Sequence, residues 1–328
     1  MQKRKLGPFE VSAIGLGCMS LSHAYGTAPP AEEGARVLLR ALDLGYTFFD
    51  TAALYGMGAN ETLVGNTLRS HRDKFVLASK CGLQVIDGKR IIDSSPAASR
   101  KVCDESLNRL GVDVIDLYYL HRWDKKTPIQ EVMSGLADLV KAGKVKTVGL
   151  SEVSAKTLRA AHEVYPITAL QSEYSPWARN AELGTLEACR ELGIAYVAFS
   201  PVARGFLTNT RLDPAKFSER DIRRGMPRFQ GDNWAKNLSL LDGFSAIARE
   251  NDCTMAQLSL AWVLSRGPHV IPIPGTTSLA HLEENAGADR VKLSAQTIAE
   301  IDGLINDRTV SGPRYNANTQ TEIDTEIA

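Results

Sequence analysis

The sequence predicts one (β/α)8 TIM barrel that spans residues 1–328 as a single domain. Three observations support this prediction: short apolar runs alternate with amphipathic stretches, eight such runs occur, and no change in composition divides the chain. Strands that alternate with helices form parallel sheets, and eight parallel strands can close around a core filled by side chains.

The predicted strands span 13–17, 47–50, 75–79, 114–120, 145–150, 168–172, 195–199 and 269–273. Between them, apolar residues recur at helical spacing, as at Val37, Leu38 and Ala41, and glycines such as Gly45 mark helix ends. The predicted helices span 30–44, 60–69, 96–110, 129–142, 155–164, 181–192, 239–251, 255–266, 279–287 and 295–306.

Three segments lie outside this alternation. A short β-hairpin around Gly7-Pro8 is predicted to close the bottom of the barrel. A long loop, residues 205–238, follows strand seven, and a C-terminal loop follows Asp307; long loops in compact proteins are usually lids or binding loops. The alternative fold is a doubly wound open sheet, supported only by Gly15-Leu16-Gly17, but the dinucleotide fingerprint requires a third glycine where this chain has Ser20.

Charge and composition narrow the class of function. The 38 basic and 38 acidic residues cancel, so no basic field would draw the chain to nucleic acid or to an anionic membrane. No apolar run is long enough to span a membrane, and MQKRKLGPFEVS lacks the apolar core of a signal peptide, so we expect a cytoplasmic protein. The cysteines are odd in number and form no C-x-x-C, which predicts neither disulfides nor a metal site; they are Cys18, Cys81, Cys103, Cys189 and Cys253.

Four chemically active side chains follow consecutive predicted strands. Asp50 ends the second strand, and Tyr55 lies in the loop after it. Lys80 and His121 end the third and fourth strands. The carboxyl ends of all strands in a parallel barrel face the same side, so we expect these residues to converge on one cleft.

This set suits proton transfer to a developing alkoxide. A nearby Lys80 would lower the pKa of Tyr55 toward a useful range for a general acid, Asp50 would keep Lys80 charged, and a neutral His121 could orient a carbonyl. None of these side chains donates hydride, so the reaction requires a cofactor, and a nicotinamide is the obvious one.

The chain resembles the aldo-keto reductase superfamily over essentially its full length. Within that superfamily it looks most similar to the branch that contains perakine reductase and similar bacterial proteins. The motifs that carry the resemblance are DTAALYG, ASKCG, YYLHRWD, GLSE (149–152), LQSEYSPWAR (170–179), FSPVARGFL (199–207) and PIPGTTSLAHLEEN (272–285). The resemblance implies that Asp50, Tyr55, Lys80 and His121 form the catalytic tetrad, with Tyr55 as the acid.

The resemblance also implies a cofactor site. Ser151 and Gln171 would hold the nicotinamide carboxamide. Most relatives also use an Asn for this contact, at the position where this chain has Glu152. Phe199 would stack on the nicotinamide ring. Glu284 and Asn285 would reach the adenine. The remaining implied cofactor residues lie in the two loop motifs: Ser200, Pro201, Arg204, Gly205, Gly275, Thr276, Thr277 and His281.

The loop before the helix at 279–287 is expected to bind phosphate, because backbone N–H groups at a helix N-terminus attract anions. The resemblance favours NADP(H). Relatives that prefer it usually carry a Lys or Arg that pairs with the 2′-phosphate, but this chain has the neutral Thr277 and Ser278 at those positions. NAD(H) therefore stays open. If NADP(H) is the cofactor, the basic residue that takes the place of this Lys or Arg would be His281 or one from the long loop: Arg211, Lys216, Arg220, Arg223, Arg224 or Arg228.

The substrate is expected to be an aldehyde or ketone of moderate size, because the residues predicted to rim the cleft are mostly apolar. They are Met19, Tyr25, Leu54, Trp123 and Trp177, each of which could equally be core packing. Arg122 and Arg179 could select an anionic substrate or face water. We expect a monomer or weak homo-oligomer, because a closed barrel leaves no strand edge open.

Two other functions remain as alternatives. Similar barrels serve as cofactor-sensing β subunits of potassium channels, and the tetrad does not exclude such a regulatory role. A metal-dependent hydrolase would need clustered ligands such as H-x-H, and no such pair exists among the six histidines.

Overall fold

The predicted eight-stranded parallel barrel is confirmed by the computed structural model, which describes residues 1–22, 24–86 and 88–327. The strands pair in chain order, so the doubly wound alternative, whose strand order reverses, is wrong. In that order they are β3 (Leu16–Gly17), β4 (Phe48–Asp50), β5 (Val76–Cys81), β8 (Ile115–Leu120), β9 (Val145–Ser151), β10 (Ala169–Glu173), β11 (Ala195–Phe199) and β12 (Val270–Pro272).

Backbone hydrogen bonds join the first and last strands of this sheet. The N–H of Gly15 donates to the carbonyl of Pro272 at 3.0 Å, and the N–H of Gly17 donates to that of Pro274 at 3.2 Å. A Cβ atom at Gly17 would lie 2.8 Å from the carbonyl oxygen of Ile273, so a side chain there would force the two strands apart. Glycine at this position therefore allows the ring of strands to close.

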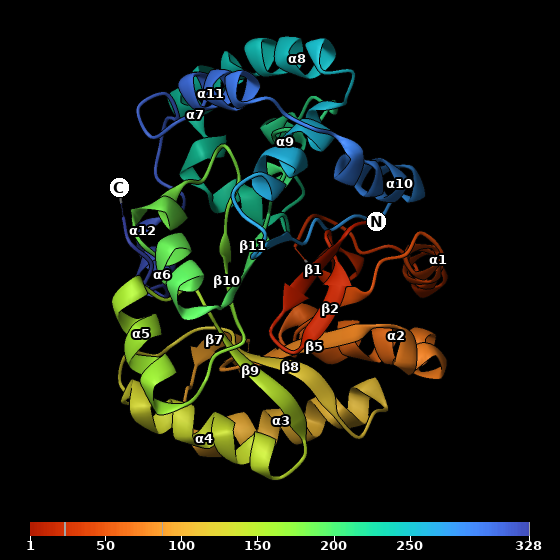
Figure 1. Ribbon diagram of the computed structural model, residues 1–328, viewed down its shortest axis with the longest axis vertical. Coiled ribbons are helices and arrows are strands. Elements are labelled where there is room, and N and C mark those ends of the chain that lie inside the picture. Colours follow the sequence, from red (N-terminus) through yellow and green to blue (C-terminus); the bar gives the residue numbers. More distant parts are fainter. Residues whose placement is uncertain (23, 87, 328) are drawn as a thin grey trace.

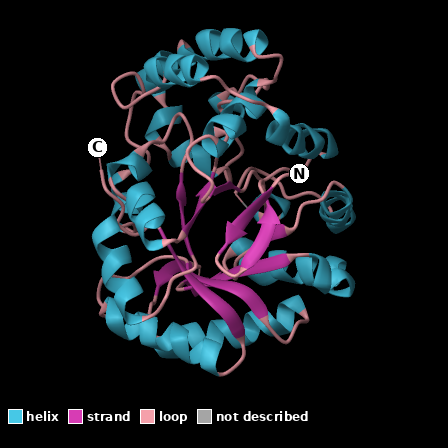
Figure 2. Ribbon diagram, in the orientation of Figure 1, coloured by secondary structure: helices cyan, strands magenta, loops and turns pink. Residues whose placement is uncertain are grey.

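Helices surround the strands on the outside of the barrel (Figures 1 and 2). Those that follow the strands are α1 (Ala31–Asp43), α2 (Ala59–Leu68), α3 (Pro96–Leu110), α4 (Ile129–Lys141), α5 (Ala155–Val164), α6 (Thr185–Leu192), α9 (Met255–Leu264) and α10 (Leu279–Gly287). The others are α7 (Gly231–Leu238), α8 (Leu240–Glu250), α11 (Ala295–Leu304) and α12 (Ala317–Thr321).

Side-chain caps explain why several of these helices begin where they do. The Ser95 hydroxyl accepts the N–H of Ala98 at the start of α3, and Thr254 forms a reciprocal capping box with Gln257 at the start of α9. One predicted helix, 181–192, is shorter than expected. A 3₁₀ turn ends before Gly184, whose φ of 150° interrupts the helical path, and α6 begins after it.

Apolar side chains fill the inside of the barrel, and the predicted hairpin closes its amino-terminal end. The hairpin consists of β1 (Lys3–Leu6) and β2 (Phe9–Ser12), and both Leu6 and Val11 belong to the inner cluster that includes Phe48 and Ile271. The bottom of the barrel is therefore sealed, which leaves the carboxyl ends of the strands as the open side.

Two loops contain more structure than we expected from the sequence. A second hairpin, β6 (Leu83–Ile86) with β7 (Lys89–Ile92), extends from the loop after β5. The segment 205–238 forms short 3₁₀ turns and ends in α7. None of the helices in the described part of the chain is both long and apolar enough to cross a membrane.

Candidate active site

A cavity of about 850 Å³ opens at the carboxyl ends of the strands. Three of the predicted catalytic residues, Asp50, Tyr55 and His121, line it. Lys80 lies beneath its floor and is 1% exposed. The strands therefore bring together the residues that the sequence placed at their ends.

Lys80 connects the acid and the phenol of this group. Its ammonium donates to the Asp50 carboxylate, to the Thr51 carbonyl at 2.8 Å and to the Tyr55 phenol oxygen at 3.2 Å. The other Asp50 oxygen accepts the Gln171 amide at 2.7 Å. The position of the phenol is therefore fixed by a chain of buried polar contacts.

The pKa values of this group differ in part from expectation. Burial raises the pKa of Tyr55 above its ordinary value of 10.0, and this effect outweighs the opposing charge of Lys80. Burial alone would lower the pKa of Lys80, but Asp50 and Tyr55 raise it above 10.5. At neutral pH, Lys80 is therefore charged and Tyr55 carries its proton, the form that an acid requires.

His121 lies against Tyr55, with ring centroids 5.8 Å apart and the rings nearly perpendicular. The next residue, Arg122, donates from Nη1 to the carbonyl of His121 at 2.6 Å and to the hydroxyl of Ser151 at 3.2 Å. The end of β8 is thus tied to the end of β9, beside the phenol.

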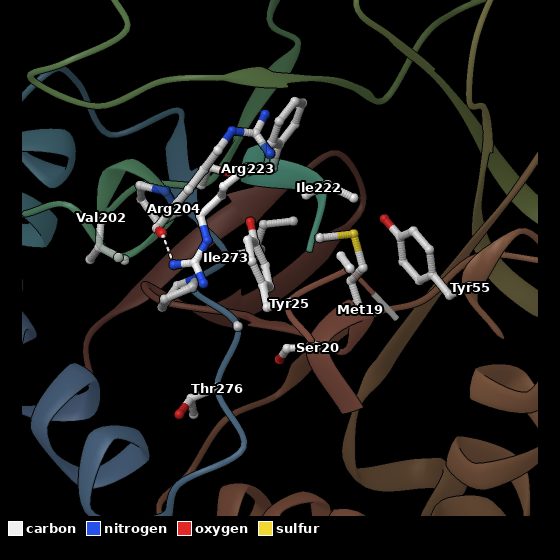
Figure 3. Close-up of a pocket in the computed structure, with 18 of the residues that line it drawn as sticks. Met19, Ser20, Tyr25, Tyr55, Val202, Arg204, Ile222, Arg223, Ile273 and Thr276 are labelled. Carbon is white, nitrogen blue, oxygen red and sulfur yellow. Dashed lines mark hydrogen bonds between the residues drawn. The ribbon is translucent and has the colours of Figure 1, made fainter. Parts of the chain in front are cut away.

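All of the residues predicted to bind the cofactor line this cavity. They are Ser151, Gln171, Phe199, Ser200, Pro201, Arg204, Gly205, Gly275, Thr276, Thr277, His281, Glu284 and Asn285. Figure 3 shows Tyr55 on one side of the cavity and Arg204 and Thr276 on the other. The predicted residues therefore extend from the phenol toward the end of β12.

The end near β12 has the features of an anion site. Helix α10 begins there, the Ser278 hydroxyl caps it by accepting the N–H of His281, and the Thr276 hydroxyl accepts the N–H of Ser278. The remaining N–H groups of the first turn have no intrahelical acceptor, because an α-helix leaves its first four donors unpaired. Together with the helix dipole, these donors favour a bound phosphate.

The wall of the cavity contains a buried polar group that could pair with a dinucleotide. The Ser20 hydroxyl is buried in its wall and has no hydrogen-bond partner among the residues that the structure describes (Figure 3). A Cβ atom at Gly275 would lie 2.8 Å from the carbonyl oxygen of Gly17, so glycine at this position lets the loop after β12 lie close against the end of β3. The residues present thus fit a polar ligand that runs along the ends of β12 and β3.

The residues predicted to rim the cleft divide into two groups. Met19, Tyr25 and Leu54 line the cavity. The structure does not bring Trp123 or Trp177 to it. The ring of Trp177 stacks on Phe206 with centroids 4.3 Å apart, and the indole N–H of Trp123 donates to the Thr127 carbonyl at 2.8 Å.

The basic residues of the long loop 205–238 differ in whether they reach the cavity. Only Arg223 among those predicted lines the cavity, and it is paired with Asp221 and donates to the Arg204 carbonyl (Figure 3). Arg228 is tied to the Trp177 carbonyl. The rest are exposed and do not line the cavity: Arg211, Lys216, Arg220 and Arg224.

A buried charge network connects the predicted site to the C-terminal segment. Glu152, at the position where the resemblance places an Asn in most relatives, is paired with Arg314. Glu173 is paired with Arg204 at 2.8 Å, and Arg204 also donates to the Tyr315 phenol at 3.1 Å. Sequence reasoning missed Arg314 and Tyr315 because they lie far along the chain from the strands they contact.

Comparison with known proteins agrees with this geometry. Residues 13–306 match the aldo/keto reductase family. The chain is 44% identical to aldo-keto reductase yakc of Schizosaccharomyces pombe, whose name specifies NADP(+), over 98% of this chain and 96% of that protein. It is 43% identical to a probable aldo-keto reductase of Glycine max, over 96% and 92% of the two chains.

A solved structure of a glycerol dehydrogenase from Gluconobacter oxydans has the same fold, with a TM-score of 0.86. It is 28% identical in sequence, and the match covers 95% of this chain and 97% of that one. The similarity therefore extends over nearly the whole of both chains.

Proposed function

Because the chain belongs to the aldo/keto reductase family and is an NAD(P)H-dependent oxidoreductase, we propose that it reversibly reduces aldehydes or ketones to alcohols with Tyr55 as the general acid. The observation that carries the proposal is the buried chain from Asp50 through Lys80 to the Tyr55 phenol at the cavity floor. We further propose that residues 1–328 act as one domain, in the cytoplasm.

The roles of the side chains follow from their contacts. A reduced nicotinamide, when bound, supplies the hydride that no side chain in the site can supply. Tyr55 gives its proton to the carbonyl oxygen as negative charge develops there, and Lys80 stabilises the phenolate because it already donates to the phenol oxygen. His121 orients the carbonyl beside the Tyr55 ring. In the oxidative direction the phenolate takes the proton back.

Other residues would hold the cofactor. Ser151 and Gln171 lie next to the catalytic group and would hold the carboxamide of the nicotinamide. The Gln171 side-chain amide already donates to Asp50, so the carbonyl oxygen of Gln171 would accept from the carboxamide. Phe199 offers a face for stacking. The N-terminus of α10, with Thr276 and Arg204, would bind the phosphates.

NADP(H) is the proposed cofactor, because the relative from Schizosaccharomyces pombe is named for NADP(+). Of the basic side chains that the sequence suggested as replacements for the missing Lys or Arg, His281 and Arg223 line the cavity, so these two would contact a 2′-phosphate. The regulatory alternative resembling potassium-channel β subunits is not favoured, because the relatives found are named as reductases and a dehydrogenase.

The proposal is tested by fluorescence titration of the purified protein with NADPH and with NADH, followed by reduction of a panel of aromatic and aliphatic aldehydes. We expect tighter binding of NADPH and turnover of several aldehydes. Binding of a nicotinamide without turnover of any carbonyl would favour the regulatory alternative. Binding of neither cofactor would contradict the proposal.

A further inference from the structure

Four arginines line the cavity, and one of them differs from the other three. Three are paired with a carboxylate at 2.7 or 2.8 Å: Arg90 with Glu322, Arg204 with Glu173, and Arg223 with Asp221. Arg122 has no carboxylate within ion-pair distance in residues 1–22, 24–86 and 88–327, although it is only 8% exposed. It is therefore the cavity arginine whose charge the described protein leaves uncompensated.

The hydrogen bonds of Arg122 leave one edge of its guanidinium without a partner among the described residues. Both bonds, to the His121 carbonyl and to the Ser151 hydroxyl, come from Nη1. The Nε atom is buried and has no partner among the described residues. The edge formed by Nε and Nη2 carries two parallel N–H donors, which is the geometry that a carboxylate accepts in a bidentate pair.

Burying such a charge without a counter-ion is costly, because a guanidinium removed from water needs a compensating charge. A second cation increases this cost. Burial lowers the pKa of Arg90 from its ordinary value, Glu322 opposes this effect, and the charge of Arg122 lowers the pKa further. An anion at this end of the cavity would relieve both the unpaired charge and the repulsion between the two arginines.

The phosphates of a dinucleotide are not the expected anion. Arg122 follows β8, whereas the phosphate-binding features follow β11 and β12, and β9 and β10 separate β8 from β11 in the sheet. Arg122 instead follows His121 directly, and His121 packs against Tyr55. An anion bound by Arg122 would therefore lie beside the reacting carbonyl, on the substrate.

We propose that Arg122 binds a carboxylate of the substrate, so that the preferred substrates are aldehydes or ketones that carry a carboxylate group. This inference rests on the proposed carbonyl reduction at Tyr55. It assigns Arg122 a role in substrate selection in addition to its contacts with His121 and Ser151.

The test compares 4-carboxybenzaldehyde with benzaldehyde under NADPH saturation, in wild type, Arg122→Gln and Arg122→Lys. A hydrogen bond to a charged group contributes about 1.5–3 kcal/mol, so wild type should prefer the carboxylate by about 10- to 150-fold in kcat/KM. Arg122→Gln should lose this preference through a higher KM for 4-carboxybenzaldehyde, and Arg122→Lys should restore part of it. The control, Arg36→Gln, removes an exposed arginine that does not line the cavity and should keep the wild-type preference.

Inhibition of the wild-type protein gives a second measurement that needs no variant. Benzoate should compete with the aldehyde at a concentration at least about tenfold lower than benzamide does. The inference is overturned if both inhibitors act equally, or if Arg122→Gln slows both aldehydes by the same factor, which would mean that Arg122 only positions its neighbours. The inference is also overturned if the wild-type protein reduces benzaldehyde and 4-carboxybenzaldehyde equally well. If the wild-type protein reduces neither aldehyde, the proposed function itself is contradicted.

Discussion

The carboxylate of Glu152, at the end of β9, is paired with the guanidinium of Arg314 from the C-terminal segment, and both side chains are buried. Glu152 also accepts the N–H of Glu173 at 3.0 Å. The residues that follow Arg314 form part of the cavity wall, because Tyr315, Asn316 and Thr319 line it. A charge pair at the strand ends therefore holds the C-terminal wall of the site in place.

Replacement of Glu152 by Gln should destabilise the protein. Among the described residues, the change leaves the buried Arg314 with only the more distant carboxylate of Glu173, 3.7 Å from its Nε. Breaking a buried ion pair costs about 3–5 kcal/mol. Urea-induced unfolding would measure the loss. The control, Glu187→Gln, removes an exposed partner of Arg190 and should leave the unfolding midpoint unchanged. Equal midpoints for both variants would contradict the assigned role of Glu152.

Glu173 should make the stability sensitive to acid. Burial alone would raise its pKa, but Arg204 and Arg314 lower it below the ordinary value of 4.5. A carboxylate whose pKa is lower in the folded state stabilises that state above the ordinary pKa, and this stability is lost as the pH falls through the folded pKa. Thermal unfolding of wild type below pH 4.5 should therefore show a steeper decline than that of Glu173→Gln. Parallel declines would contradict this prediction.

The pH dependence of catalysis should follow Tyr55. Its pKa is raised by burial more than Lys80 lowers it, so the phenol stays protonated through neutral pH. Reduction requires the protonated form, so kcat/KM for an aldehyde should be level through neutral pH and fall only above about pH 10. Oxidation requires the phenolate and should become faster as the pH rises. A reductive rate that already falls between pH 7 and 8, with the fold intact by circular dichroism, would argue against Tyr55 as the acid.

Replacement of Thr277 by Lys should strengthen the preference for NADPH over NADH. Thr277 is exposed at the rim of the cavity, directly before the residue that caps α10, so a lysine there could pair with a 2′-phosphate without disturbing the cap. An exposed charge pair contributes about 0.2–1 kcal/mol, so the ratio of the two dissociation constants should change by about 1.4- to 5-fold. Fluorescence titration measures it, with Thr277→Gln as the uncharged control. An equal change in both variants would mean that the charge of the lysine has no part in the effect.

The strands and the catalytic group could be predicted because both depend on local pattern. Lys80 and His121 each end an apolar run, and a parallel barrel brings such ends to one side. The hairpin after β5 was missed, although Asp87-Gly88 between two apolar runs is a sequence signal typical of hairpins. This hairpin was therefore predictable from its local sequence.

Other features could not be predicted because they depend on contacts distant in sequence. Nothing in the motif around Glu152 indicates that its partner is Arg314, 162 residues away. Trp177 was expected at the cleft because it follows β10, but packing against Phe206 from the next loop places it in the core. The absence of a described carboxylate beside Arg122 likewise depends on where every other loop lies.

The measurement that tests the central claim most directly is single-turnover reduction of benzaldehyde by Tyr55→Phe in the presence of NADPH. The variant lacks only the phenol oxygen that Lys80 contacts, so NADPH should bind as in wild type while the rate of reduction falls by about 10²- to 10⁴-fold. Fluorescence titration of the same samples would show that the cofactor site is intact. A variant that binds NADPH and reduces the aldehyde at the wild-type rate would contradict the role of Tyr55 as proton donor.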